Sequence, residues 1–371
     1  MSGADALRPA EDTDAWLRLA LTPQLGPSTQ RKLLRAFRGP REIFEASRAE
    51  LVRAAGESAA QAVLAGADTA LLQRSIDWLQ ESGNHLLTLA DQRYPRALLE
   101  TTDPPLLLFV MGRVELLDHA ALAVVGSRTA TPRGTRDAEA FAQALSDAGL
   151  TIISGLALGI DSAAHRGGLS GASSSVAVVG TGLDKVYPAR NRELAHRLAI
   201  EGALISEFPL GTPPLAANFP RRNRVISGLA RGCLVVEAAL RSGSLITARQ
   251  ALEQGREVFA VPGSIHSPLS KGCHWLIKQG AKLVETAQDV LEELGLVGVA
   301  TGASAAREDD GAPLQPHESA VLAAMGFEPV DLDTICQRTH LAADAASALL
   351  LKLELEGYLS RLPGGLLQRM R

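Results

Sequence analysis

The feature that most constrains the fold is a regular alternation of short apolar runs with helical stretches in the middle of the chain. Six runs of five or six residues are rich in Val, Ile, Leu and Ala: residues 121–126, 150–154, 175–180, 203–207, 233–237 and 257–261. Strands that are apolar along their whole length are buried on both faces, as in parallel sheets covered by helices. The alternation predicts the α/β class, with an extended Rossmann-like, doubly wound parallel sheet.

The segment before this sheet has helical periodicity. Two stretches within it, LGPSTQRKLL (residues 25–34) and AGESAAQAVL (residues 55–64), can be laid over one another. They resemble helical hairpins, in which a glycine turn and the next helix N-terminus offer backbone N–H groups to a nucleic-acid phosphate. A small helical bundle used for packing or protein contact explains the same pattern, and both interpretations stay open.

The end of the chain predicts a further small domain. After a small, polar and proline-containing stretch, helical patterns resume and end in two short apolar runs around Pro363-Gly364-Gly365, as in a winged helix. Its second helical segment holds Lys352 against three acidic residues, which favours a protein-contact or accessory role over reading duplex DNA. We therefore expect a helical domain at residues 1–84, the sheet domain at 85–295, a linker at 296–315 and a winged helix at 316–371.

One stretch of the sheet domain has a charge opposite to that of the whole chain. Residues 219–249 hold six arginines and one glutamate, whereas the formal net charge of the chain is -4. This bias indicates a local anionic partner. The three cysteines are isolated, without metal-ligand spacing, so no metal site and no cofactor is predicted. The first residues do not have the pattern of a signal peptide, and no long apolar segment is recognised, so a cytoplasmic location is expected.

Small or polar clusters follow the predicted strands, at the edge where doubly wound sheets bind ligands. A glycine there allows close approach of a ligand, and a helix start favours an anion. The clusters are Gly126-Ser127-Arg128, the run 180–185 that ends at Lys185, the run Phe219 to Arg224, and a possible anion-binding helix start made of Ser242, Gly243, Ser244 and Thr247.

Several enzyme classes are disfavoured by what these clusters lack. No G-x-G-x-x-G run follows the first strand and no Walker A run occurs, which argues against nicotinamide chemistry and ATP hydrolysis. Ser154, Asp161 and His165 contain the residue types of a hydrolase triad, but Ser154 lacks the G-x-S-x-G elbow. Hydrogen bonding within the loop is the preferred interpretation, and no catalytic residue is assigned.

The chemistry of the basic run favours single-stranded nucleic acid. Aromatic rings stack on unpaired bases while neighbouring arginines hold the backbone, and Phe219 is the one aromatic residue directly beside Arg221, Arg222 and Arg224. Placement of Phe219 in the core, at the start of the next helix, is the alternative.

At these residues the chain closely resembles the DNA-processing protein A (DprA or Smf) family. The matching stretches are VVGSR (124–128), SGLALGIDSAAH (154–165), GTGLDKVYPARN (180–191), FPRRNRVISGL (219–229), VVEAALRSGSLITA (235–248) and VPGSI (261–265).

The resemblance implies an extended Rossmann domain, preceded by a sterile-alpha-motif-like helical domain and followed by a winged helix. It also implies a non-enzymatic homodimer, formed through the central domain, which coats and protects incoming single-stranded DNA in natural transformation and helps load the RecA recombinase. The resemblance also implies a site for single-stranded DNA. The positions of this sequence that match the family's site are Gly126, Ser127, Arg128, Lys185, Phe219, Arg221, Arg222, Asn223 and Arg224.

Two other functions fit the sequence less well. A phosphoribohydrolase-like enzyme on the same fold would use a glycine-rich helix start such as SGSLITA, but its P-G-G-x-G-T-x-x-E run is absent. A transcription regulator acting through the winged helix would need a basic recognition helix.

Overall fold

A computed structural model describes residues 12–296, 315–326, 329–362 and 364–370. The chain divides into two compact units, one with the N-terminal helices and a large sheet, the other with the C-terminal domain. The predicted linker, residues 296–315, lies almost wholly outside the described residues, as does Pro363 of the predicted wing. Within the described ranges, no helix has the length and apolar character needed to cross a bilayer.

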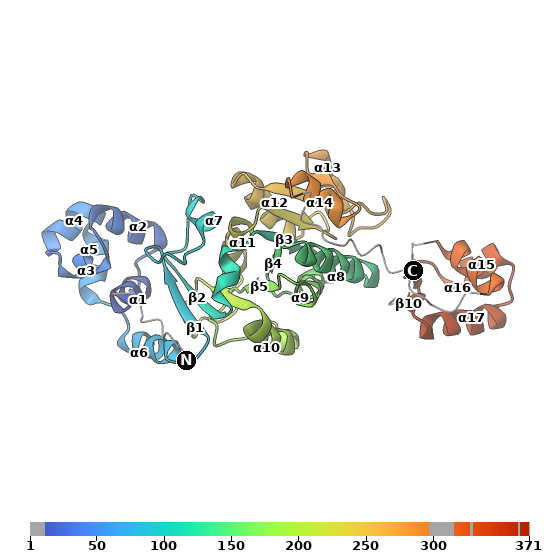
Figure 1. The fold of residues 1–371 in the computed structure, drawn as a ribbon, viewed down its shortest axis with the longest axis horizontal. Coiled ribbons are helices and arrows are strands. Elements are labelled where there is room, and N and C mark those ends of the chain that lie inside the picture. Colours follow the sequence, from blue (N-terminus) through green and yellow to red (C-terminus); the bar gives the residue numbers. More distant parts are fainter. Residues whose placement is uncertain (1–11, 297–314, 327–328, 363, 371) are drawn as a thin grey trace, which may run out of the picture. The chain divides into compact units, whose positions relative to one another are not determined.

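The first unit is built on one nine-stranded sheet with the order β1-β2-β6-β5-β4-β3-β7-β8-β9. Figure 1 labels the strands β1 to β5 of this sheet. The strands from β3 to β9 pair in parallel, whereas β2 pairs antiparallel with β6, and β1 antiparallel with β2. The strands are β1 (Asn84–Thr88), β2 (Leu107–Gly112), β3 (Ala121–Val125), β4 (Thr151–Ser154), β5 (Ser175–Val178), β6 (Ala203–Ser206), β7 (Gly232–Val235), β8 (Glu257–Ala260) and β9 (Lys282–Leu283).

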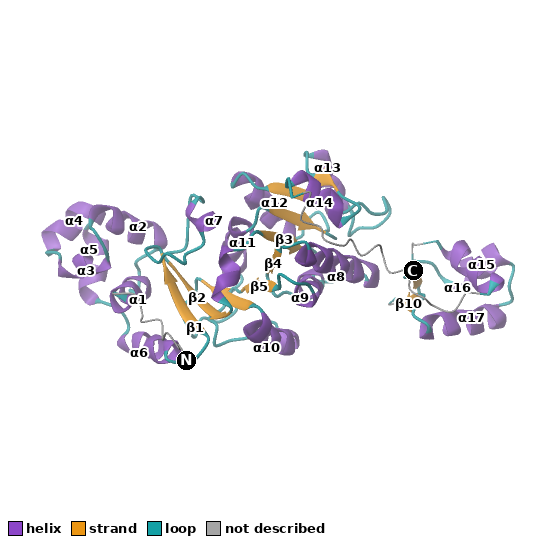
Figure 2. Cartoon of the chain, viewed as in Figure 1, coloured by secondary structure: helices purple, strands orange, loops and turns teal. Residues whose placement is uncertain are grey.

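Helices connect and cover these strands (Figure 2). Those of the sheet region are α7 (Arg96–Leu99), α8 (Pro132–Asp147), α9 (Ile160–Ser170), α10 (Arg192–Glu201), α11 (Asn218–Leu229), α12 (Ser244–Glu253), α13 (Lys271–Lys278) and α14 (Ala287–Glu293), with the short 3-10 helices η1 (Val114–Asp118) and η2 (Ala189–Asn191).

Both faces of the sheet are buried because side chains alternate along each strand. On β3, Ala121, Ala123 and Val125 face the core under α11, α12 and α13. Leu122 and Val124 face the other core, under α8, α9 and α14. Two covered faces explain why the strands read as continuous apolar runs, and the predicted α/β class with a doubly wound, mostly parallel sheet is confirmed.

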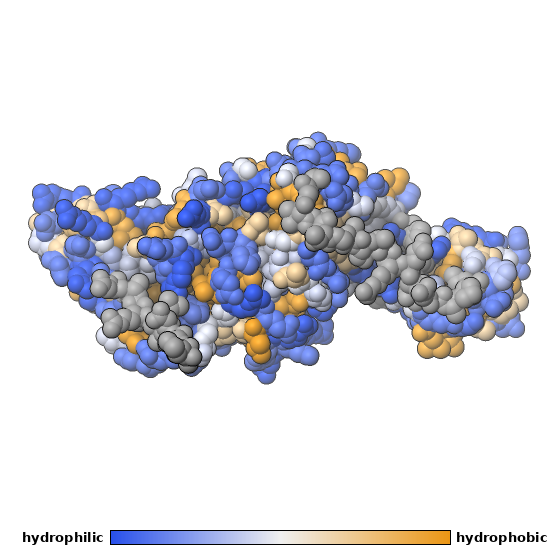
Figure 3. All heavy atoms as spheres, in the orientation of Figure 1, coloured by the Kyte–Doolittle hydropathy of each residue, from blue (hydrophilic) through white to orange (hydrophobic). Residues whose placement is uncertain are grey.

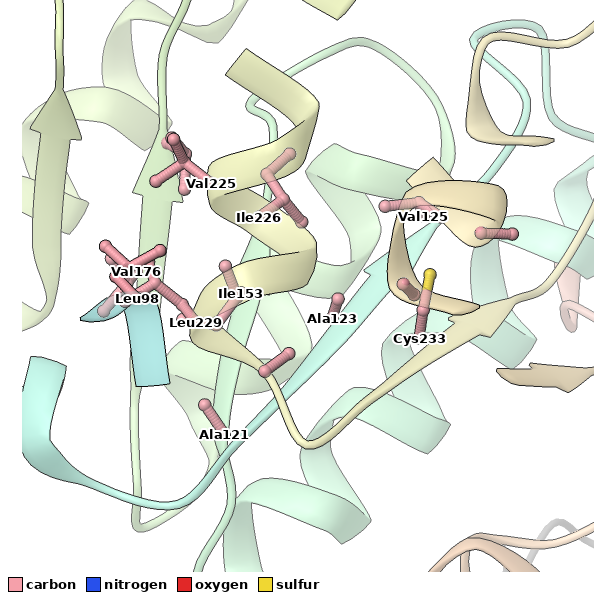
Figure 4. Packing of buried hydrophobic residues seen from close by; sticks show 14 of the residues in the cluster. Leu98, Ala121, Ala123, Val125, Ile153, Val176, Val225, Ile226, Leu229 and Cys233 are labelled. Carbon is pink, nitrogen blue, oxygen red and sulfur yellow. The ribbon is translucent and has the colours of Figure 1, made fainter. Parts of the chain in front are cut away.

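Helix α11 is fixed on the sheet by its C-terminal half. Val225, Ile226 and Leu229 are buried and point toward side chains of β3, β4, β5 and β7 (Figure 4). Small residues on β3, such as Ala121 and Ala123, leave room for this close packing. This anchoring holds the N-terminal half of α11, which carries the basic run, at the carboxyl ends of the strands.

The N-terminal helices belong to the same unit. Leu17, Leu21 and Trp78 share a buried cluster with Phe109 of β2, whose ring lies edge-on to Trp78 at 5.8 Å between centroids. The helices are α1 (Thr13–Leu21), α2 (Pro27–Ala36), α3 (Pro40–Glu45), α4 (Arg48–Ala55), α5 (Glu57–Ala65) and α6 (Thr69–Leu79). The two glycine turns recognised in the sequence precede α2 and α5. Because α1 and α6 share a buried cluster with β2, these helices pack on the antiparallel part of the sheet.

The second unit contains a winged helix, as predicted. Its helices α15 (Pro316–Met325), α16 (Leu332–Thr339) and α17 (Ala343–Leu355) pack on a hairpin of β10 (Leu359–Arg361) and β11 (Leu367–Arg369). On α17 the single cation, Lys352, is paired with Glu318 at 2.5 Å. Leu351 and Leu355 are 51% and 81% exposed, and apolar atoms are visible on this unit in the space-filling view (Figure 3). This helix therefore presents an apolar and acidic surface.

Candidate nucleic-acid interface

The site lies where the order of the sheet reverses. From β3 the chain continues to β4 on one side, whereas β7 lies on the other side of β3. Loops leaving β3 and β7 therefore diverge, which opens a crevice at the carboxyl ends of these strands. A cavity of about 660 Å³, called the switch cavity below, occupies this position. Its volume lies within the range of about 300–1,000 Å³ that is usual for ligand sites.

The switch cavity brings together most of the residues predicted from the sequence. They come from the loop after β3, the first turns of α11 and the start of α12. The predicted residues that line it are Gly126, Ser127, Arg128, Phe219, Arg222, Asn223, Ser242, Gly243, Ser244 and Thr247.

The loop after β3 is fixed against the loop after β7. The N–H of Ser127 donates to the carbonyl of Glu237 at 2.7 Å, and the carbonyl of Ser127 accepts from the N–H of Ile160. A Cβ on Gly126 would lie 2.6 Å from Cγ1 of Ile160, so only glycine fits there. These contacts place Arg128, which is exposed, at the cavity rim.

Phe219 is half-buried and lies among cations and a second aromatic ring. The guanidinium carbons of Arg128 and Arg222 lie 5.8 and 5.9 Å from its ring centroid. The ring of Tyr187 lies 5.7 Å away between centroids, tilted by 42°. An aromatic surface next to an exposed arginine has the components that hold an unpaired base and its phosphate.

Sequence reasoning did not include Tyr187 among the site residues. Tyr187 is 48% exposed and lines the switch cavity beside Phe219. Its only signal in the sequence is an aromatic residue in a loop that follows a strand, two positions after Lys185. Arg241 and Ile246, which also line the cavity, were missed because nothing in the sequence separates them from other surface residues of the basic stretch.

Arg222 belongs to the buried wall of the cavity. Its side chain lies among the strand ends, and the whole residue is 4% exposed. Nη1 donates to the carbonyls of Gly155, at 2.6 Å, and of Val178, and Nε donates to Oδ1 of Asn223. Burial lowers the pKa of Arg222 to about 10, although the nearby carboxyl of Asp161 opposes this change. The guanidinium thus stays charged at neutral pH and ties α11 to β4 and β5.

The other two arginines of the run lie outside the switch cavity. Arg224 pairs with Glu207 at 2.5 Å and lies 3.5 Å from a carboxylate oxygen of Asp103. Arg221 pairs more loosely with the same Glu207 oxygen, at 3.2 Å, and its side chain is 43% exposed. Lys185 is exposed on the loop after β5 and does not line the cavity either. Arg221 and Arg224 thus pair with Glu207 and do not line the switch cavity.

The loop after β4 is held by buried polar side chains. Oδ2 of Asp161 accepts from the N–H groups of Gly155 and Ala157, at 3.2 and 3.3 Å. The amide of Asn191 donates to the carbonyl of Leu156 at 2.8 Å. These bonds hold Leu156 in a left-handed conformation, with φ of 58°.

His165 completes this network. Its Nε2 accepts from the N–H of Leu156 at 3.3 Å, so its Nδ1 carries the proton and donates to Oγ of Ser175 at 2.8 Å. The hydroxyl of Ser154 donates to the carbonyl of Val124, away from both His165 and Asp161. The three residues therefore do not form a triad, and they order the loop as the sequence predicted.

The start of α12 forms the opposite wall. The hydroxyls of Ser242 and Ser244 lie 2.7 Å apart, and the N–H of Ser244 donates to Oγ of Ser242. Gly243 is the N-cap of α12. No group of three or more His, Cys, Asp or Glu side chains that is suited to a metal ion occurs among the described residues.

Comparison with known families gives two matches. The sequence profile of a family described as DNA recombination-mediator protein A matches residues 85–295. That of the DprA winged helix domain matches residues 305–365.

Individual proteins are also similar over long stretches. Protein Smf of Escherichia coli K12 is 46% identical over 305 residues, which cover 81% of this chain and 81% of that protein. DNA processing protein DprA of Streptococcus pneumoniae R6 is 48% identical over 206 residues, covering 56% of this chain and 73% of that protein.

Two solved structures are similar as well. The X-ray structure of DNA processing protein A from Streptococcus pneumoniae has a TM-score of 0.68 and 38% identity, covering 76% of this chain and 98% of that one. A structure of the Helicobacter pylori protein, described by its single-stranded DNA binding mode, has a TM-score of 0.52 and 29% identity, covering 57% of this chain and 95% of that one.

The buried histidine gives the first prediction. Burial lowers the pKa of His165 to about 3, whereas the unfolded chain takes up this proton near pH 6.5. The folded state therefore loses stability relative to the unfolded state as pH falls below 6.5. His165→Gln should remove this effect, so the parent should lose about 2 kcal/mol relative to the variant between pH 6.5 and 5.

Urea unfolding of both proteins at a series of pH values measures this difference. The shift of Asp161, whose pKa is raised by burial, acts in both proteins and cancels in the comparison. Equal pH slopes for the parent and His165→Gln would contradict the buried neutral histidine.

Proposed function

The chain belongs to the DNA recombination-mediator protein A family, whose role is DNA processing, and we propose that it binds single-stranded DNA in the switch cavity. The observation that carries this proposal is the position of half-buried Phe219 beside exposed Arg128, at the point where the sheet order reverses. The Helicobacter pylori relative, which is described as a single-stranded DNA-binding protein, supports the same ligand.

The chemistry of the cavity suits a single strand of any sequence. Phe219 and Tyr187 offer ring faces for unpaired bases, and every base has a face that stacks. Arg128 and the positive end of the α12 dipole supply positive potential for the phosphates. A paired duplex hides its base faces, so this cavity should prefer single strands.

The predicted site residues have different roles in this proposal. Arg128 contacts phosphate and Phe219 stacks, whereas Arg222 orders the cavity wall from within. Lys185, exposed on the neighbouring loop, extends the positive path beyond the cavity. Arg221 lies on the far side of the first turn of α11, and Arg224 mainly neutralises Glu207.

Replacing Arg128 or Phe219 tests the cavity directly. Arg128→Ala should weaken binding to all single strands and reduce the slope of log K against log salt by about 0.7, since one phosphate contact is lost. Phe219→Ala should cost about 1–3 kcal/mol of binding free energy, and Phe219→Tyr should restore most of it. Salt titrations of single-stranded and duplex oligonucleotides, followed by fluorescence anisotropy, measure both effects.

Arg231→Ala is the matched control because Arg231 is exposed and precedes β7, at the opposite edge of the sheet. It should leave the salt slope unchanged. Tighter binding of duplex than of single strands by the parent, or full affinity in Arg128→Ala and Phe219→Ala, would contradict the assignment.

We further propose that the chain protects incoming strands in the cytoplasm during natural transformation and helps load RecA on them, as the family resemblance implies. The family description as a recombination mediator supports this role. With a single strand coated by single-strand-binding protein, adding this chain should restore the DNA-dependent ATPase activity of RecA, and Phe219→Ala should restore it poorly. No rescue by the parent chain, with oligonucleotide binding intact, would contradict RecA loading.

A homodimer through the central domain is the remaining part of the proposal. Besides the family resemblance, it is supported by large exposed apolar side chains on and near α12, α13 and β9: Leu240, Leu252, Trp275 and Leu283 are 60%, 51%, 37% and 45% exposed. Pairing with a second copy of the chain removes such side chains from water. Sedimentation should give twice the chain mass for the parent and a monomer for Trp275→Glu.

Ile200→Glu is the control for this experiment, because Ile200 is 78% exposed on α10, away from these elements. A parent that sediments as a monomer at micromolar concentration would exclude the dimer.

A further inference from the structure

A second cavity flanks the first turn of α11. It has a volume of about 400 Å³ and is lined by the turn between α1 and α2, the start of β2 and the segment after β6. Arg221 lines this cavity, whereas its neighbours Pro220 and Arg222 line the switch cavity. The two cavities therefore lie on opposite sides of residues 220–222, near the start of α11. The second one is called the hairpin cavity below, after the predicted helical hairpin that begins at Leu25.

The walls of the hairpin cavity suit a flat, partly apolar group. The apolar residues of its lining include Leu21, Leu25, Pro27, Phe109 and Phe208. The guanidinium carbon of Arg221 lies 5.3 Å from the ring centroid of Phe208, which holds the cation at the cavity wall. Gly26 is the N-cap of α2, and Pro27 begins the helix.

Glu207 is the buried charged group among the residues that line this cavity. Its side chain is 4% exposed, and Oε2 accepts from both Arg224 and Arg221. Oε1 is buried and accepts no hydrogen bond from the described residues. A buried acceptor without a donor is unfavourable. A ligand that donates a hydrogen bond to Glu207 relieves this cost.

Arg221 is the part of the wall that can move. Its bond to Glu207, 3.2 Å, is longer than that of Arg224, 2.5 Å, and its side chain is 43% exposed, against 13% for Arg224. If Arg221 releases Glu207 but stays at the cavity wall, Arg224 still neutralises the carboxylate. A small displacement of Arg221 therefore opens Glu207 to the cavity at little electrostatic cost.

We propose that the hairpin cavity binds an unpaired nucleobase that carries an exocyclic amino group, from the same strand that occupies the switch cavity. The amino group donates to Glu207, and Arg221 donates to the ring acceptor beside it, as on the pairing edge of cytosine or adenine. Thymine places a carbonyl oxygen where cytosine has its amino group, and this oxygen is repelled by the carboxylate. The inference rests on the proposed single-strand binding and adds a base preference to it.

Homopolymers test this preference. Anisotropy with 20-mers at pH 8 should show oligo-dC bound about tenfold more tightly than oligo-dT, the size expected for a charged hydrogen bond that only one base makes. An oligonucleotide of 2-pyrimidinone deoxynucleotides, which lacks the amino group, should bind like oligo-dT. Equal affinity of the parent chain for oligo-dC and oligo-dT would overturn the proposal.

Two variants locate the preference in the hairpin cavity. Glu207→Gln should bring the ratio of the two affinities close to one. Gly26→Trp should do the same by filling the cavity, and it should fold, because φ at Gly26 is -69° and a Cβ there meets no atom within 4 Å. If Glu207→Gln fails to fold, Gly26→Trp alone decides.

The outcomes separate this inference from the proposed function. Arg128→Ala should weaken binding of both homopolymers equally and keep their ratio. A ratio that stays at the parent value in Gly26→Trp would overturn the hairpin-cavity site while single-strand binding stands. Failure of the parent chain to bind either homopolymer would instead overturn the proposed function itself.

Discussion

The arrangement of the site depends on the buried guanidinium of Arg222. A buried cation is tolerated only where acceptors and opposite charge compensate for its lost hydration. Here the acceptors are the carbonyls of Gly155 and Val178, at the ends of β4 and β5, with Asp161 as the nearby opposite charge. Satisfying Arg222 therefore fixes the distance between two strand ends and the first turn of α11.

This constraint extends to neighbouring residues. A Cβ on Gly155 would lie 2.6 Å from Nη2 of Arg222, so the loop after β4 needs glycine there. Asp161, His165 and Asn191 hold the rest of that loop with buried hydrogen bonds. The exposed groups of the switch cavity thus stand on a rigid frame, which limits the conformational entropy lost when a strand binds. The frame and the binding surface are made by adjacent residues of one helix turn.

The sequence predicted the fold well because the patterns of apolar residues that define strands and helices lie within short segments of the chain. Each strand from β3 to β8 is a mostly apolar run, and α11 carries its apolar residues at helical spacing, Val225, Ile226 and Leu229. The loop role of Asp161 and His165 was preferred because Ser154 lacks the G-x-S-x-G elbow of a catalytic serine. Domain boundaries within residues 297–314 stay predictions, since the structure does not describe that segment.

The candidate site was only partly predictable, because charge in a sequence does not show its partner. Arg221, Arg222 and Arg224 look equivalent in the basic run, yet one is buried and two pair with Glu207. Arg224 also reaches the backbone of Asp103, 121 residues away. Tyr187 joins Phe219 only through folding. Long-range pairs of this kind decide which cations remain available to a ligand.

The most direct test of the central claim is to map where a bound strand touches the chain. A single strand that carries 5-bromodeoxyuridine is irradiated in complex with the full chain, and the cross-linked peptides are identified by mass spectrometry. The account predicts cross-links on Phe219 and Tyr187, at the switch cavity. Cross-links confined to the winged helix, residues 316–370, would contradict it.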